Sequence, residues 1–402
     1  MSAPLRPVFV TAAAALSRFG AGWRGLAQAV RTQSGGFAPA RQLQASHGAV
    51  LAAEVPPLAP DTDVEPRARK LMAYPARLAA VALRQLLHDT GWNAAQREAC
   101  GFYLGVGASG AHMQEINAML AASIEQHEFD LARFGQHGLA ACNPLFAFQL
   151  MNNFTMCHGA ILSGIGGPNS ALFSRGTGTH AALAEAHWLL ASGGAGLAIA
   201  GGADSALHPA TWSQLWRDGF AGQGLLPGEG AALLALGTEV GLHNNPQNGP
   251  ESRMQSESQR VPLTGALARL EHCENQSAKA WQAAPDLLLQ QLAALQFDAV
   301  VLAPWGDPAR VALLQALARR GEMLPQAPLP QVLDVSAALG EALAASPALA
   351  WCVALDWLHE TPPDTKLVAA PQTGSTDWLH RALVLSAGID GGFGLTLLCR
   401  HP

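Results

Sequence analysis

The chain has 402 residues, of which 49% are apolar and 13% charged, and its formal net charge is -6 at pH 7. This apolar content can fill one large core or two ordinary ones. The negative balance gives no electrostatic reason to expect nucleic acid or an anionic membrane surface as a partner. No apolar run reaches about 18 residues and no signal peptide is recognisable, so we expect a cytoplasmic protein without a membrane span.

Short apolar runs bounded by glycine predict β-strands, and helical patterns lie between them. The strands are expected near residues 10, 105, 199, 234 and 302, then at LTGALARLEHC and at GGFGLTLLC. Helices are expected over Arg77–Trp92 and from Thr179 to a stop at Gly193-Gly194. Because the strands are continuously apolar, both faces of the sheets should be buried under helices, which is typical of α/β proteins.

One segment breaks this composition. His243–Arg260 is polar, rich in Pro, Gly, Asn and Ser, and free of aromatic residues, which predicts an exposed linker. The chain would then divide into an N-terminal half over residues 1–242 and a C-terminal half over 261–402. Six cysteines lie scattered without C-x-x-C spacing, which argues against a zinc site and a disulfide framework.

The stretch 167–186, GPNSALFSRGTGTHAALAEA, predicts a strand, a tight glycine turn and a helix. Such a turn can cradle an anion or present a nucleophile at the helix N-terminus, yet its tip is Gly176. The run from Gly176 to Ala181 fits the G-x-G-x-x-A pattern of dinucleotide sites, but the nearest candidate for the acidic residue after the next strand, Asp204, lies beyond the expected spacing of about 20 residues. The other interpretation is a nucleophile elbow that has lost its nucleophile.

Further motifs occur in a fixed order along nearly the whole chain. They are PVFVTAAAALSRFG, NPLFAFQLMNNFTMCHGAILSGIGGPN, IAGGAD, LPGEGAALLALG and SAGIDGGFGLTLL. Together they resemble β-ketoacyl-ACP synthases of the thiolase fold. The resemblance implies an α/β fold of two similar βαβαβαββ halves that form a five-layered α-β-α-β-α core.

The resemblance also locates the family's catalytic positions in this chain. Counted from Gly-Pro-Asn at 167–169, the catalytic cysteine falls on Gly176. The first histidine falls on Pro304, and the lysine and second histidine on Ser336 and Glu341. Condensation needs a thiolate that carries the acyl chain and neutral imidazoles that stabilise the enolate and the oxyanion. We therefore expect no catalytic residue, no metal and no cofactor, and we interpret Cys142, Cys157 and His158 as packed side chains.

A ketosynthase-like chain without these residues is similar to the chain-length factors of type II polyketide systems, most of all those of aryl polyene clusters. The resemblance implies a silent subunit that pairs with an active β-ketoacyl synthase and shapes the tunnel for its acyl or polyene chain. Acyl carrier protein would take part indirectly. Two alternatives stay open: a stand-alone acyl-binding homodimer, and an enzyme that uses a dinucleotide or retains malonyl decarboxylation.

The resemblance places the tunnel and the subunit interface on two segments before the elbow, on the strand that leads into it, and on the C-terminal turn. Ile389 and Asp390 replace the gating phenylalanine and a neighbouring glycine of the family in that turn. The candidate residues are Met113, Gln114, Leu145, Phe146, Ser170, Ala171, Leu172, Phe173 and Ile389.

Overall fold

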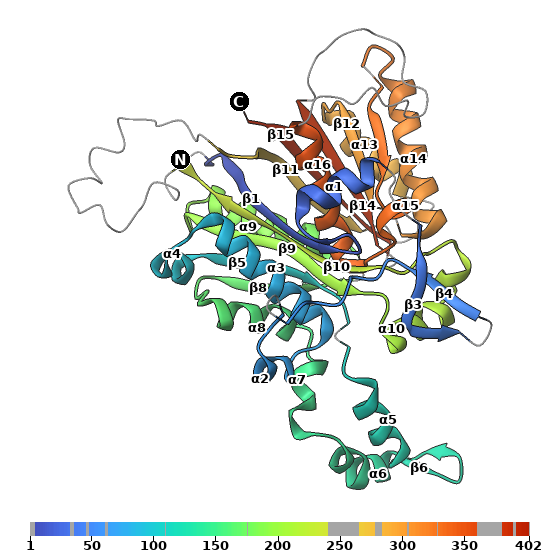
Figure 1. Cartoon of the computed structure of the whole chain (residues 1–402). Helices are drawn as coiled ribbons and strands as arrows, with labels where there is room; N and C mark the ends of the chain where they lie inside the picture. Colours follow the sequence, from blue (N-terminus) through green and yellow to red (C-terminus); the bar gives the residue numbers. More distant parts are fainter. Residues whose placement is uncertain are drawn as a thin grey trace.

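The computed structural model describes most of the chain (Figure 1). The described residues are 5–32, 36–45, 48–60, 63–108, 110–174, 176–239, 265–277, 284–303, 305–327, 329–359, 380–388 and 391–401. The predicted linker at 243–260 lies outside them. None of the helices in this described part combines the length and hydropathy that crossing a bilayer requires.

Five strands of each half build one continuous sheet. In the N-terminal part the elements are β1 Val8–Ser17, β2 Gly20–Ala21, α1 Trp23–Arg31, β3 Ala38–Ala45, β4 Gly48–Ala52, α2 Pro66–Arg69, α3 Tyr74–Thr90, α4 Ala94–Ala99, β5 Gly101–Val106, α5 Met113–Ala121, β6 Ile124–Glu125, β7 Glu128–Phe129, α6 Leu131–Arg133, η1 Phe134–Gly138, η2 Leu139–Ala141, η3 Pro144–Phe146, α7 Ala147–Leu150, α8 Phe154–Ser163, β8 Asn169–Phe173, α9 Gly178–Ala191, β9 Leu197–Ser205, α10 Pro209–Arg217, η4 Phe220–Gly222 and β10 Glu229–Gly237. The C-terminal part contains β11 Ala268–Ser277, α13 Ala284–Ala294, β12 Ala299–Ala303, α14 Gly306–Met323, β13 Gln331–Asp334, α15 Ser336–Leu339, η5 Leu343–Ala345, α16 Ser346–His359, β14 Arg381–Ala387 and β15 Gly392–Arg400.

The two halves repeat one strand order. The N-terminal strands lie in the order β1-β10-β9-β5-β8 and the C-terminal strands in the order β11-β15-β14-β12-β13. In both sets the first strand is antiparallel to the last, the last is antiparallel to the fourth, and the second and third follow in parallel. A short antiparallel pairing of β1 with β11 joins the two sets edge to edge.

Helices cover both sets of strands and also separate them, giving the expected five layers. Helix α3 and the outer face of the N-terminal strands form one hydrophobic cluster. Helices α9 and α16 lie in the middle, where α9 packs on β5, β9 and β11 and α16 on β14, β12 and β10. Helices α13 and α14 close the outer face of the C-terminal strands (Figure 1). The predicted α/β fold class is confirmed.

Local sequence explains where the predicted helices begin and end. Helix α3 has a proline in its first turn and stops at Gly91, whose φ of 63° is the left-handed conformation that glycine adopts without strain. Helix α9 ends just before Gly193, which has a φ of 84°. The strand β10 is buried along its whole length, which explains its unbroken apolar sequence.

Residues 113–151, here called the arm, project away from these layers (Figure 1). The arm contains α5, the β6–β7 hairpin and the short helices that lead to α7. Its base is fastened by the buried side chain of Gln149, whose Oε1 accepts from the His112 backbone N–H at 3.2 Å and whose Nε2 donates to the Lys70 carbonyl at 2.9 Å. Composition and motif order did not predict this projection.

Candidate functional site

The elbow lies where β8 turns into α9. The tip residue, Gly176, has a φ of 130°, a left-handed conformation that disfavours side chains, and its N–H donates to the Ser174 carbonyl at 2.9 Å. The Ser174 and Thr177 hydroxyl oxygens lie 3.1 Å apart across the turn. Gly176 and the first turn of α9 are buried. The structure therefore keeps the geometry of a strand–turn–helix elbow without a reactive group at its tip.

Other parts of the chain fill the space in front of this tip. A β-carbon on Gly176 would lie 2.5 Å from the Gly388 Cα atom and 3.3 Å from Trp305 Nε1. Trp305 is 3% exposed, and its ring makes an edge contact with Phe220. Pro304, which precedes this tryptophan, lies outside the described residues. The tip therefore has no room for a side chain.

Glu341, which the motif resemblance aligns with the second histidine, is buried and hydrogen-bonds to a loop of the backbone. Its Oε2 accepts from the Leu226 N–H at 2.7 Å, and its own N–H donates to the Leu226 carbonyl, also at 2.7 Å. The Arg310 guanidinium is 3.7 Å from Oε1. Burial raises the pKa of this carboxyl to about 8, against a smaller opposing effect of the hydrogen bond from Leu226 and of Arg310. The Glu341 carboxyl thus binds backbone at the position where the resemblance predicts an imidazole.

Ser336, which the motif resemblance aligns with the lysine, belongs to the same polar network. Its hydroxyl donates to Asp334 Oδ1 at 2.6 Å and accepts from Arg310 Nη2 at 2.9 Å. Arg310 Nε also donates to Asp334 Oδ2 at 2.7 Å. Ser336, Asp334 and Arg310 therefore hydrogen-bond to one another.

The sequence did not predict the burial of two further carboxyl groups, those of Asp204 and Glu229. Asp204 accepts from the backbone N–H groups of Ser205 and Ala344, at 2.8 and 3.2 Å. Glu229 accepts from the Val55 N–H at 2.9 Å and from the Ser205 hydroxyl at 2.7 Å. Burial raises the pKa of each carboxyl to about 7. Acidic residues at the ends of two apolar strands were the available signal, and both groups tie loops together.

A buried histidine behind the elbow was also missed. His180 lies in the first turn of α9, where its Nδ1 is 2.9 Å from the Thr396 hydroxyl and its ring meets Trp351 edge-on. Complete burial lowers its pKa to about 3, so the ring is neutral near pH 7. His158, treated as packed on sequence grounds, is half-buried and contacts the ring of Phe154.

The strand leading into the elbow is an exposed sheet edge. In the described part of the chain β8 pairs only with β5, in parallel register. Ser170 and Phe173 are exposed, Phe173 by 56%, whereas Ala171 and Leu172 are half-buried. Trp188 on α9 exposes 61% of its surface. An unpaired edge flanked by exposed aromatic side chains is a surface suited to another chain.

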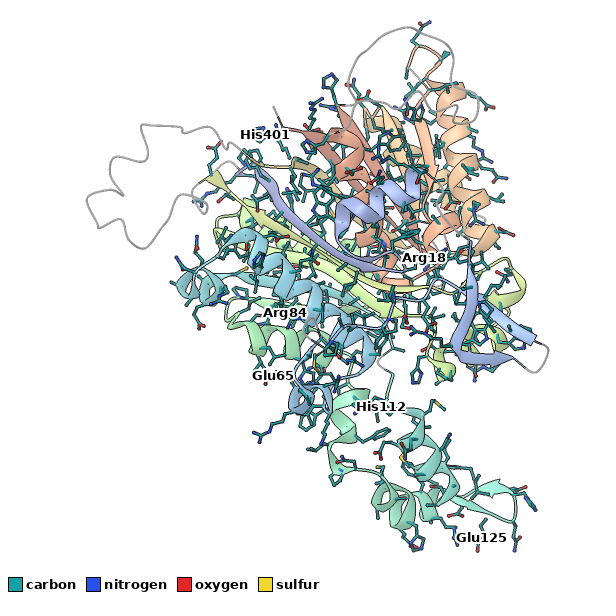
Figure 2. All side chains as sticks on the ribbon, in the orientation of Figure 1. Arg18, Glu65, Arg84, His112, Glu125 and His401 are labelled. Carbon is teal, nitrogen blue, oxygen red and sulfur yellow. The ribbon has the colours of Figure 1, made fainter. Side chains whose placement is uncertain are left out.

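The arm carries the remaining candidates. Met113 is half-buried, Gln114 is exposed, Leu145 is 47% exposed, and Phe146 is buried within this chain at 5% exposure. Ile389 and Asp390 lie outside the described residues. Figure 2 shows the side chains of the arm spreading outward from His112, near its base, to Glu125 at its far end. Nine large apolar side chains of the arm are exposed: Leu120, Ile124, Phe129, Leu131, Leu139, Leu145, Phe148, Leu150 and Met151.

The duplicated five-stranded frame, the central helix pair and the elbow define a thiolase-like protein of the ketosynthase class. The family profile "Beta-ketoacyl synthase, N-terminal domain" matches residues 39–239, half of the chain. The chain belongs to the β-ketoacyl synthase family. A search of curated protein sequences finds no match.

Solved structures agree with this fold. One neighbour, described as the ishigamide ketosynthase/chain length factor, has a TM-score of 0.72 and 17% identity, covering 99% of this chain and 100% of its own. A β-ketoacyl synthase from Burkholderia phymatum has a TM-score of 0.71 and 18% identity, with coverage of 99% and 100%. A third, the complex of a type II polyketide acyl-carrier protein with its ketosynthase, has a TM-score of 0.69 and 13% identity, with coverage of 98% and 100%.

Proposed function

We propose that this chain is a catalytically silent ketosynthase-like subunit, a chain-length factor, that pairs with an active β-ketoacyl synthase. The observation that carries the proposal is the closed tip of the elbow. A cysteine at Gly176 would need space that Gly388 and Trp305 occupy, so the packing around this position leaves no room for the nucleophile.

The other degenerate positions support the same conclusion. A carbanion or oxyanion that forms during condensation needs donors or positive charge near it. Glu341 supplies a carboxyl group that is already bonded to the Leu226 backbone, and Ser336 is bonded to Asp334 and Arg310. Without a cysteine at its tip, the elbow offers no thiolate to carry an acyl intermediate.

The exposed edge and the arm support a role as a partner. The free edge of β8 can continue its sheet into a second chain, as dimers often do when a strand is left unpaired. Exposed apolar side chains on β8, α9 and the arm would be buried by the same partner. Met113, Gln114 and Leu145 are the candidates that reach toward the partner's acyl tunnel.

The neighbour described as a ketosynthase/chain length factor supports the choice of partner. By the motif resemblance we further propose an aryl polyene system, in which carrier protein delivers acyl groups to the active subunit. A stand-alone homodimer that binds acyl groups is the second candidate, because the exposed edge of β8 could also pair with its own copy.

Co-expression with an active β-ketoacyl synthase from the same organism tests the proposal. We expect a 1:1 heterodimer by light scattering, with malonyl-ACP turnover that depends on the partner's cysteine. Phe173→Asp should disrupt the heterodimer, because it places a charge in the proposed interface. The matched variant Val332→Asp, on the corresponding edge strand β13 of the other half, should not. A stable homodimer that does not bind the synthase would support the second candidate instead.

A further inference from the structure

The far end of the arm is a two-stranded hairpin with an unusual turn. Strands β6 and β7 pair in antiparallel register, with Ile124 opposite Phe129 and Glu125 opposite Glu128. The two turn residues between them, Gln126 and His127, have φ values of 50° and 70°. Such a turn normally holds Asn or Gly at these positions, because left-handed φ values strain other side chains.

Opposite faces of this hairpin have opposite character. Ile124 and Phe129 share one face and are 47% and 54% exposed. Glu125 and Glu128 share the other face, and both are exposed. Arg133 bonds to Glu125 at 3.2 Å across the base of the hairpin. The hairpin therefore carries an apolar pair on one face and two carboxylates on the other, one of them paired with Arg133.

Three features of this hairpin oppose its stability in the isolated chain. Two residues hold strained backbone, two like charges face each other across the strands, and an aromatic–aliphatic pair lies in water. Backbone strain and unmatched surface of this kind persist where surrounding contacts compensate for them. Phe134 packs beside Phe129 at 5.8 Å between ring centroids and leaves Phe129 54% exposed. Ile124 and Phe129 stay about half exposed, so another molecule that covered this face would supply such contacts.

We propose that the hairpin 124–129 inserts into an apolar cleft of the partner synthase whose rim carries lysine or arginine side chains. This inference rests on the proposed heterodimer, in which the hairpin would select the partner. Ile124 and Phe129 fill the cleft, and the rim cations pair with Glu128 and Glu125. Since the arm has four acidic residues, Glu115, Glu125, Glu128 and Asp130, against one arginine, an identical arm could not supply those cations. Charge thus favours a different chain over the arm of a second copy.

Exchange of a fluorescently labelled copy of this chain out of the purified heterodimer tests the inference. Phe129→Ala should raise the dissociation rate about tenfold or more, because a centrally buried aromatic side chain dominates such contacts. Glu128→Lys should raise it by a similar factor at low salt and should reduce the salt dependence of association. The double variant Gln126→Asn with His127→Gly keeps both faces, relaxes the turn and should dissociate within about twofold of the wild type.

Met323→Ala and Glu322→Lys, on the exposed side of α14, are matched controls for lost apolar area and reversed charge. Wild-type dissociation rates in the Phe129 and Glu128 variants, from a heterodimer that forms normally, would overturn the inference and leave the proposed function standing. Failure of the wild-type chain to pair with any synthase would overturn both. A homodimer that tightens on Glu128→Lys would show that the hairpin instead meets a second copy.

Discussion

The two halves share one strand order and differ in what connects the second strand to the third. Between β5 and β8 the N-terminal half carries residues 107–168, which include the arm, whereas between β12 and β13 the C-terminal half carries little beyond α14. The shared frame comes from buried apolar strands that tolerate many sequences. The difference shows that partner contacts are built on a connection, where the packing of the core does not constrain them.

The corresponding central helices show the same division. Helix α16 is buried along nearly its whole length, and its Trp351 is 0% exposed. Helix α9 has the same place in its half, yet its Trp188 is 61% exposed. One helix serves only to hold the layers together, and the other also presents a surface.

The largest effect is expected from Trp351→Ala. This change removes the largest fully buried side chain from between the two sets of strands and should lower the free energy of unfolding by about 4 kcal/mol. Urea denaturation of the purified protein measures it. A loss below about 1 kcal/mol would mean that the layers close around the cavity and that α16 does not hold the two halves together.

Gly176→Cys is expected to destabilise the chain by about 3 kcal/mol without restoring condensation. The cost combines a left-handed φ with the 2.5 Å approach of the new β-carbon to Gly388. Gly22→Ala is the matched control, since Gly22 has a φ of 114° and nothing within 4 Å of its β-carbon position, and it should cost about 1 kcal/mol. Equal melting temperatures for the two variants, or a cysteine that accepts an acyl group, would contradict the closed tip.

Glu341→Gln should change how stability depends on pH. The folded state raises the pKa of this carboxyl from 4.5 to about 8, so the folded chain binds more protons than the unfolded chain between these values. Its contribution is fully present below about pH 4.5 and is lost as the pH rises through 8. The glutamine variant should flatten this decline by about 2 kcal/mol, measured as melting temperature against pH. Parallel curves for the variant and the wild type would show that this carboxyl does not titrate.

Trp188→Ala should have the smallest effect on the isolated chain, within about 0.5 kcal/mol, because its side chain lies mostly in solvent. In the proposed heterodimer the same variant should weaken pairing about tenfold. The two measurements together separate a surface role from a packing role. A large loss of stability in the isolated chain would show that Trp188 is a packing residue like Trp351. The two helices would then not differ in role.

Much of the fold followed from local patterns. The strands near residues 10, 105, 199, 234 and 302 and both long helices occur where the apolar runs and their glycine limits predict them. The burial of Asp204 and Glu229 was not predicted, because an acidic residue at a strand end belongs to no periodic pattern that would indicate it. The projection of the arm was not predicted for a related reason. Its apolar residues are as hydrophobic as core residues, and only their exposure in the structure distinguishes them.

The sequence by itself determined the α/β class, the order of the elements and the glycine at the tip of the elbow, because these depend on neighbouring residues and their spacing. Only the tertiary structure decided that Trp305 and Gly388 fill the elbow, that Glu341 bonds to the loop at Leu226, and that the arm stands clear of the layers. Each of these rests on contacts between residues more than 100 positions apart, or on their absence. Such contacts are set by how the packed layers meet, which no local pattern encodes.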